Sequence, residues 1–462
     1  MLFQRKKIRM RLLQIIKELV FLALQTQAWD KKNFTSKRNA ILIRQSLERL
    51  GSIFVKFGQM LALRPDFIPN VLCDELYKLL DQVPPFDSAK VQGILERELG
   101  KRFSYILNLE ITPVASASFA QVHKATLQAG DVIAVKIQRP DVDRLVRSDL
   151  KIVQFLAKSF DFFFQPLNKT TKIVEEFEAW TKDELDYSLE AENIEKFNTV
   201  SAQVGDGIRG PKVYKELSTT KVLTMEFIEG YSLSQIINFK KKGGEELQKL
   251  GFSGKEMINK LIRNVLETAH IYGFFHADPH PANVIFTPNR ELVYIDFGIV
   301  GSLSKKERVL ILRYFRSLLT GEADESLSTM IELCGTYLTR DHEQLKKEYG
   351  RIIGRFINTF DSKTYLEQQI RSGPILVDAL NLLQRNGFQI PVSIVRYFKA
   401  FETIEGLIFA LYPELQIKDM VKEFRRVSII NLVDSLPNSL TEKGLNNLLL
   451  KLIDSLEKSI LL

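Results

Sequence analysis

The sequence predicts an α+β protein with two lobes and a helical N-terminal extension. Residues up to about 105 carry apolar side chains at helical spacing almost throughout. Between about 106 and 137 the pattern changes to short β-prone runs joined by a turn that contains Gly130, and after Gly230 a long helical remainder follows. We expect an extension at 1–105, a small lobe with inserted helices at 106–228, a larger helical lobe at 229–345 and a C-terminal helical region at 346–462.

The composition is that of an ordinary globular protein with a sizeable core. The chain has 462 residues, of which 45% are hydrophobic and 26% are charged, and this suits two or three packed units. The formal charge of +8 and the pI near 9.1 are compatible with several anionic partners and select none of them. Cys73 and Cys334 form no C-x-x-C pair, which argues against a disulfide scaffold and favours a reducing compartment such as the cytoplasm.

Neither end of the chain predicts a membrane-spanning helix. Five basic residues between Arg5 and Arg11 precede an apolar stretch that Lys17 and Glu18 interrupt, and the uncharged run at 19–29 is too short to cross a bilayer. Two interpretations stay open: a helix lying on an anionic membrane surface, or a helix packed on its own domain with a solvated basic face. Residues 445–460 predict a second amphipathic helix, so we expect at most peripheral membrane association.

The elements of the first half follow from their periodicity. One apolar stripe at 43–57 and another at 74–81 predict helices, and Pro84 and Pro85 mark a break. The turn residues at 128–131 predict a hairpin between two strands. In chain order we expect strands at 119–127 and 132–137, helices at 141–164 and 171–202, and a buried strand at 221–227.

The second half contains the most informative motif. An apolar helix at 261–272 leads into a turn, His276-Ala277-Asp278-Pro279-His280-Pro281-Ala282-Asn283, and then into a hairpin that ends in Asp296-Phe297-Gly298. Asp278 can accept a hydroxyl proton, Asn283 can bind a metal five positions later, and Asp296 can hold the metal that bridges nucleotide phosphates. The pattern predicts the catalytic half of a kinase-like phosphoryl-transfer site.

Residues of the small lobe predict the nucleotide side of this site. Lys136 lies on a strand, where it can reach phosphates as a point charge. The backbone of Glu226 and Phe227 occupies the place where the hinge of a kinase passes the adenine. Small residues stand where a kinase keeps its glycine-rich loop, and they still let N–H groups approach phosphates: Ala115, Ser116, Ala117 and Ser118.

Three carboxylates downstream offer partners for lysines. Glu184, Asp186 and Glu190 are expected on one helix. Glu184 and Glu190 are six positions apart and so lie on different parts of its surface, which permits two separate lysine partners.

In combination, these motifs resemble the UbiB/AarF family, also called ADCK, of atypical protein-kinase-like proteins linked to ubiquinone and other isoprenoid-lipid metabolism. The family's K-x-G-Q signature stands here as Lys56-Phe57-Gly58-Gln59, followed by Arg64-Pro65-Asp66. Its alanine-rich loop is matched by residues 115–118 with Gln121-Val122-His123 behind it, and its E-x-D element by Glu184-Leu185-Asp186. Ordinary kinases lack the first element and have glycines in the second.

The resemblance implies a role for each matching residue. Lys136 would contact phosphates and pair with Glu190, Asn283 and Asp296 would bind magnesium, and Asp278 would be the catalytic-loop aspartate. Lys56 and Gln59 would belong to a helical lid over the site, with Lys56 reaching Glu184. Ala282 departs from the glycine that is frequent in the family.

We therefore expect a bilobal protein-kinase-like fold whose N-terminal extension covers the active site. The expected cofactors are ATP or ADP and Mg²⁺, and the activity is hydrolysis or transfer to a small or lipid-like acceptor, with no nucleic acid partner. Protein phosphorylation is disfavoured because a helix predicted at 304–318 follows Gly298 almost at once and no Ala-Pro-Glu anchors a peptide-binding segment.

Three other interpretations account for part of the pattern. A small-molecule phosphotransferase of the aminoglycoside or choline kinase type uses a similar H-x-D motif, but the segment 56–59 and the alanine-rich loop argue against it. A nucleotide-binding pseudokinase scaffold gains no support, because every catalytic position is filled. A metal cluster of His270, His276 and His280 fits the prolines of the loop less well than a kinase does.

Overall fold

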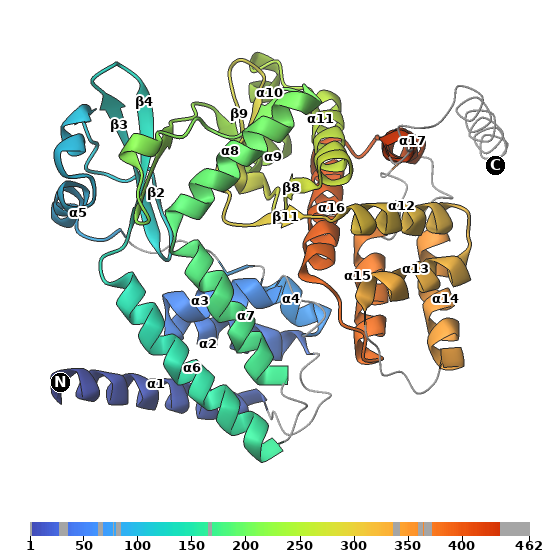
Figure 1. Cartoon of the computed structure of the whole chain (residues 1–462), viewed down its shortest axis with the longest axis horizontal. Helices are drawn as coiled ribbons and strands as arrows, with labels where there is room; N and C mark the ends of the chain where they lie inside the picture. The colour runs from blue at the N-terminus through green and yellow to red at the C-terminus, as the bar shows by residue number, and fades with distance from the viewer. Residues whose placement is uncertain are drawn as a thin grey trace.

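The structure is a computed structural model that describes residues 2–26, 36–62, 68–76, 78–79, 85–164, 169–335, 342–358, 364 and 372–434. The segment 64–66 and the helix expected at 445–460 lie outside these residues. The described chain forms two lobes with a layer of N-terminal helices beside them (Figure 1). Within the described residues, no helix is both long and apolar enough to cross a membrane.

The N-terminal layer consists of helices that range from 7 to 25 residues in length. It contains α1 (Leu2–Thr26), α2 (Lys37–Leu50), α3 (Ser52–Ala62) and α4 (Asn70–Leu76). The stripe expected as one helix at 43–57 is two helices, because Gly51 between α2 and α3 adopts a φ of 95°, which favours glycine.

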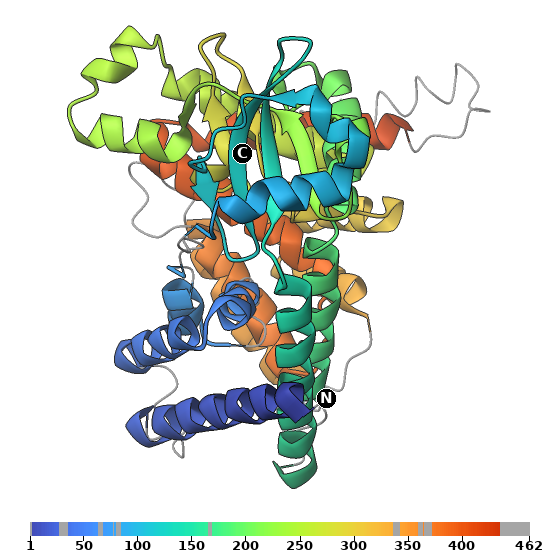
Figure 2. The same cartoon turned by 90° about the vertical axis from the view of Figure 1, so that its left-hand side faces the viewer.

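Two long helices inserted in the small lobe pack on this layer, as Figure 2 shows. They are α6 (Val142–Phe164) and α7 (Lys169–Glu184). Their apolar side chains share one core with those of α1 and α3. The core includes Ile15, Leu50, Ile53, Phe54, Met60, Phe119, Val142, Val146, Leu150, Ile152 and Phe177.

The small lobe is built on an antiparallel sheet with strand order β1-β3-β4-β6 and β2 beside β3. Along β4, Ile133, Val135 and Ile137 pack on α5 (Ala89–Leu99), and Lys136 points to the opposite side because successive side chains alternate across a strand. The strands are β1 (Ile106–Leu107), β2 (Ala115–Ser116), β3 (Ala120–Leu127), β4 (Val132–Gln138) and β6 (Val222–Glu226). The boundary between the N-terminal extension and the small lobe at residue 105 remains a proposal. Helix α5 precedes this boundary in the sequence but packs on the sheet of the small lobe.

The larger lobe combines helices with two small sheets. Strand β10 pairs with β9 and with β5, β7 pairs with β9, and β8 pairs with β11. The strands are β5 (Ile208–Arg209), β7 (Tyr231–Ser232), β8 (Phe274–His276), β9 (Val284–Phe286), β10 (Leu292–Tyr294) and β11 (Val300–Ser302). The helices are α8 (Tyr187–Val204), α9 (Leu233–Lys241), α10 (Glu245–Lys249), α11 (Gly254–Glu267), α12 (Lys305–Leu319), α13 (Ala323–Cys334), α14 (His342–Asn358), α15 (Ser372–Arg385), α16 (Val392–Leu411) and α17 (Ile417–Asp434).

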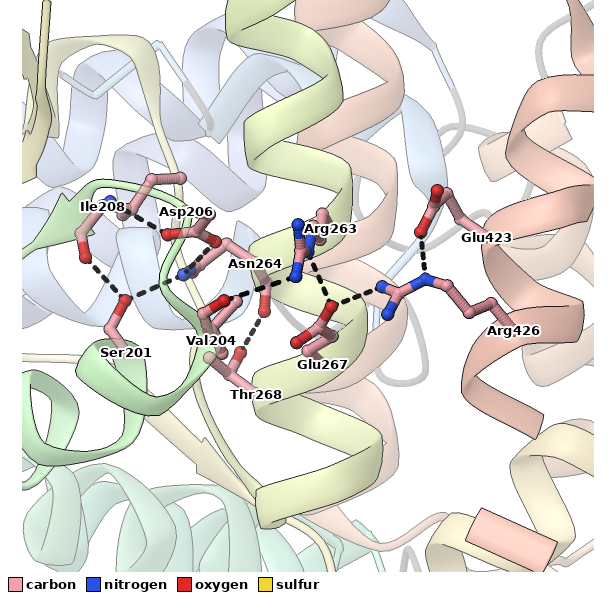
Figure 3. A network of polar contacts seen from close by, with 10 residues as sticks. All are labelled: Ser201, Val204, Asp206, Ile208, Arg263, Asn264, Glu267, Thr268, Glu423 and Arg426. Carbon is pink, nitrogen blue, oxygen red and sulfur yellow. Dashed lines mark hydrogen bonds and ion pairs between the residues drawn. The ribbon is translucent and has the colours of Figure 1, made fainter. Parts of the chain in front are cut away.

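One apolar core runs through this lobe from α8 to α17, so the C-terminal helices pack on it directly. A polar network links three of its parts (Figure 3). Asn264 on α11 donates to Asp206 and to Ser201, each at 3.0 Å. Glu267, one turn later, binds Arg426 of α17. These contacts hold α8, α11 and α17 in a fixed arrangement.

Candidate nucleotide site

A cavity of about 630 Å³ lies between the two lobes and gathers most of the predicted site residues. Strands β3 and β4 line one side, the segment after β6 lines the back, and the loops before β9 and after β10 line the other side. The predicted residues that line it are Lys56, Ala115, Ala117, Lys136, Glu184, Glu190, Glu226, Phe227, Asn283 and Asp296. Gln59, Ser116, Ser118, Asp186 and Asp278 do not line it.

Lys136 and Glu190 form an ion pair inside the cavity. The Lys136 ammonium donates to both carboxylate oxygens of Glu190 on α8, at 2.9 and 2.7 Å. Burial opposes the charge on Lys136, but Glu190 and Asp296 together raise its pKa, so this lysine stays protonated. A fixed positive charge at this point is suited to bind phosphate oxygens.

Asp296 and Asn283 supply oxygen atoms on the opposite wall. Asp296 Oδ1 accepts a hydrogen bond from Gly298 N at 2.9 Å. Burial opposes its ionisation, yet Lys136 and the Gly298 hydrogen bond lower the pKa of Asp296 on balance, so it remains a carboxylate. A carboxylate and an amide oxygen fit the preference of Mg²⁺ for hard oxygen ligands.

These two residues alone do not complete a metal site. Among the described residues, no group of three or more His, Cys, Asp or Glu side chains is arranged to hold a metal ion. A magnesium ion here would need oxygens from phosphates and water as well, which is how Mg²⁺ is usually bound beside nucleotides. The donor set therefore fits a metal that arrives with its nucleotide.

His276 connects the loop of Asp278 to the strand end of Asp296. Its Nε2 lies 2.6 Å from Asp296 O, and Asp278 N donates to its Nδ1 at 3.3 Å. This network assigns the proton of the neutral ring to Nε2, and burial lowers the pKa of His276 in agreement with a neutral ring. His270 is likewise used elsewhere, at 2.8 Å from Tyr397 Oη, so the two rings serve the fold and not a histidine metal cluster.

Asp278 does not line the cavity. Its Oδ1 is buried and has no hydrogen-bond partner among the described residues. Burial raises the pKa of Asp278, against the opposing effect of His276 and His280. A carboxylate without a donor is suited to accept a proton, and this role for Asp278 remains a proposal.

The alanine-rich loop is a tight hairpin that Arg139 stabilises through hydrogen bonds. Ala117 N donates to Ala120 O at 2.8 Å, and Arg139 donates to Ala117 O and to the Ser116 hydroxyl, both at 2.8 Å. No residue of 115–118, all of them described, has a positive φ, so the loop adopts a backbone that alanine allows. Its two alanines face the cavity, while the Ser116 side chain faces Arg139.

The hinge segment at the end of β6 makes hydrogen bonds through both its side chains and its backbone. The Glu226 side chain binds Arg209 at 2.7 and 2.9 Å, and Arg209 also reaches Glu291 at 3.3 Å. The N–H groups of Glu226 and Phe227 donate to Lys212 O and Val132 O. We therefore propose that adenine would contact the carbonyl groups of Glu226 and Phe227 and the backbone of Ile228.

The lid residues meet the small lobe at the edge of the cavity. Lys56 Nζ on α3 lies 2.5 Å from Glu184 Oε1, and its charge lies 5.7 Å from the ring centre of Phe119. Gln59 does not share this environment, because its amide donates to Leu79 O at 3.2 Å.

The carboxylates do not lie on one helix as expected. Helix α7 ends at Glu184, and Asp186 is the N-cap of α8, where its carboxylate accepts from Ser188 N at 3.0 Å. The two separate lysine partners expected for Glu184 and Glu190 are present, and the break between α7 and α8 is what separates them.

Arg396 of α16 is a cavity residue that the sequence motifs did not indicate. Its Nη1 donates to Val300 O at 2.9 Å, just after the Asp296 loop. Tyr187 and Met225 were missed as well, and both line the cavity from buried positions. Arg396 is 100 positions from Asp296 in the sequence, so no local pattern could place it.

Comparison with known proteins gives consistent matches. Residues 78–330 match the ABC1 atypical kinase-like domain. Protein ACTIVITY OF BC1 COMPLEX KINASE 7, chloroplastic, from Arabidopsis thaliana is 31% identical over 390 residues, covering 83% of this chain and 54% of that protein. An uncharacterized protein in the hydrogenase 1 5' region of Clostridium pasteurianum is 30% identical over 416 residues, covering 89% of this chain and 75% of that protein. The structure of the complex of Rv3197 and erythromycin from Mycobacterium tuberculosis aligns with a TM-score of 0.56 and 25% identity, covering 79% of this chain and 90% of that one.

Fold and cleft together define a protein-kinase-like α+β protein, as the sequence predicted. The chain belongs to the ABC1 atypical kinase-like family, which confirms the resemblance to UbiB/AarF proteins. A kinase-like domain implies nucleotide binding. The chain spans about half the length of the Arabidopsis relative.

Proposed function

We propose that this protein is an ATP- and Mg²⁺-dependent atypical kinase or ATPase that does not act as a conventional protein kinase. The observation that supports the proposal is the ion pair of Lys56 and Glu184 at 2.5 Å, because both residues line the cavity. In addition, β11 ends at Ser302 and α12 begins at Lys305, which leaves little chain for a peptide-docking segment.

The predicted catalytic and metal-binding residues each have a defined task in this proposal. Lys136, oriented by Glu190, binds phosphate oxygens, and Asn283 and Asp296 would hold the magnesium ion. The ion, when bound, neutralises charge on the phosphates. Asp278 accepts the proton of the attacking hydroxyl or water, and His276 keeps its loop beside Asp296.

The acceptor is proposed from the family alone. A small or lipid-like molecule, with a role in ubiquinone or other isoprenoid-lipid metabolism, is compatible with a covered cleft and with peripheral placement at a membrane surface. The alternatives are a small-molecule phosphotransferase of the aminoglycoside or choline kinase type and a pseudokinase scaffold. Fold does not decide among them.

Phosphate release and labelling of generic protein substrates, measured side by side with the full chain, test the proposal. We expect magnesium-dependent phosphate release with little protein labelling. Strong, stoichiometric protein labelling without hydrolysis would contradict it. No turnover despite nucleotide binding would favour the scaffold.

A further inference from the structure

Where the structure describes the side chains of α1, those that contact the rest of the protein lie on one side of the helix. Ile15 is fully buried in the core that α1 shares with α3 and α6. Arg11 binds Asp149 of α6 at 2.8 Å, and Glu18 binds Arg49 of α2 at 2.6 Å. These contacts fix which side of α1 faces the protein.

The opposite side of α1 is apolar and exposed. Positions 10, 13, 17, 20 and 24 are three or four residues apart and so form one stripe, in which Lys17 is the charged member. Leu13 is 64% exposed and Leu24 is 68% exposed. We call this surface the outer face of α1, and it consists of Met10, Leu13, Ile16, Val20, Phe21 and Leu24.

This surface lies at the border of the molecule. Figures 1 and 2 both show α1 at the end remote from the small-lobe sheet. From position 10 to position 24 the outer face is about 21 Å long at the helical rise of ~1.5 Å per residue. An apolar stripe of this length, exposed on a docked helix, indicates a binding surface.

The charge of the segment indicates which partner binds. The first eleven residues contain no acidic residue and, besides Arg11, which pairs with Asp149, four basic residues; the chain carries +8. A second copy would bring the same positive charge to the contact, which is unfavourable. A bilayer with anionic lipids offers negative headgroups and an apolar layer together, and amphipathic helices with basic residues bind there.

We propose that the outer face of α1 docks on an anionic lipid bilayer while its inner face stays on α2 and α6. The helix then lies in the plane of the headgroups and does not span the membrane. This inference rests on the proposed function and deepens it. It names the surface that would bring the cleft to a lipid-like acceptor.

Vesicle cosedimentation of the full chain tests the surface. The wild type should bind equimolar phosphatidylcholine and phosphatidylglycerol vesicles more tightly than phosphatidylcholine alone. The variant Leu13→Glu/Leu24→Glu should lose at least about tenfold in affinity for the anionic vesicles. The matched control is Val309→Glu on α12, an exposed apolar residue of the large lobe, and it should bind as the wild type.

Three results would overturn the inference. The first is unchanged vesicle binding by the double variant when its melting temperature equals that of the wild type. The second is an equal loss in Val309→Glu. The third is a dimer that the wild type forms without lipid in analytical ultracentrifugation and the double variant does not form, while both proteins still bind vesicles. The outer face would then bind a second copy of the chain.

The same assay separates this surface from the proposed activity. Asp296→Asn should bind vesicles as the wild type does, because Asp296 is in the cleft. If the wild type hydrolyses no ATP but its vesicle binding depends on Leu13 and Leu24, the proposed function fails and the docking surface stands.

Discussion

Lys56 of α3 and Glu184 of α7 meet through an ion pair of 2.5 Å at the edge of the nucleotide cavity. Both side chains are largely buried, with exposed fractions of 12% and 19%. The pair joins two segments 128 positions apart in the sequence and fixes the N-terminal layer on the small lobe.

A double-mutant cycle measures this contact. Lys56→Met and Glu184→Gln should each lower the free energy of unfolding, because each leaves a buried polar partner behind. The double variant should be less destabilised than the sum of the two single substitutions, with a coupling free energy of about 1 kcal/mol or more. Denaturant unfolding gives the values, and the exposed pair Arg147 and Asp143 is the control cycle, expected near zero. A Lys56–Glu184 coupling no larger than the control would mean that the pair does not hold the lid.

The pair of Lys136 and Glu190 predicts a separation of stability from binding. Lys136→Met leaves the Glu190 carboxylate buried and unpaired, so it should destabilise the protein by about 3 kcal/mol and weaken ATP binding. Adding Glu190→Gln removes the unpaired charge and should restore most of the stability. It should not restore ATP affinity, since the cation is still missing. Recovery of both by the second substitution would show that Lys136 acts only through folding.

Arg396 should contribute to triphosphate binding from α16. Arg396→Gln removes a cation from the cavity and should weaken the affinity for ATP by about tenfold, with a smaller effect on the affinity for ADP. Lys346, exposed on α14, gives the matched control Lys346→Gln. Calorimetric titration of both nucleotides checks the difference, and equal losses for ATP and ADP would assign Arg396 to holding Val300 instead.

The buried His270 predicts a pH dependence of stability. Burial, with Arg308 nearby, lowers the pKa of His270 to about 3, below the ~6.5 of an unfolded histidine. The unfolded chain therefore binds the proton more tightly, and stability decreases as pH falls below about 6.5, by up to ~1.4 kcal/mol per pH unit from this residue.

Comparison of two histidine variants isolates this contribution. His270→Gln should show a shallower loss of stability between about pH 6 and pH 4 than the wild type, even if it is less stable at neutral pH. His342→Gln, at an exposed position of α14, should keep the wild-type slope. Parallel slopes for all three proteins would show that His270 does not titrate in this way.

Local patterns predicted the elements that carry the chemistry. The turn at 128–131 and the β-prone run at 132–137 placed Lys136 on a strand, and the segment from His276 to Asn283 predicted the loop before a hairpin. These features depend on near neighbours in the sequence. The break at Gly51 has a cue in the sequence, a glycine inside a helical pattern.

Other features depend on packing between distant segments. The apolar stripes of α6 and α7 predicted helices, but they did not say that these helices would cover α1 and α3. The same holds for Arg396 and for the Arg209–Glu226 pair, whose partners come from separate strands and helices. Nor did the basic N-terminus predict that the exposed side of α1 would be apolar.

Calorimetric titration of ATP with and without Mg²⁺, for the wild type and for Asp296→Asn, tests the central claim most directly. Asp143→Asn, at an exposed position of α6, is the matched control. We predict that the wild type and the control bind ATP more tightly with Mg²⁺, and that Asp296→Asn loses this difference while its melting temperature shows it is folded. Unchanged magnesium-dependent affinity in Asp296→Asn would contradict the assignment of the site.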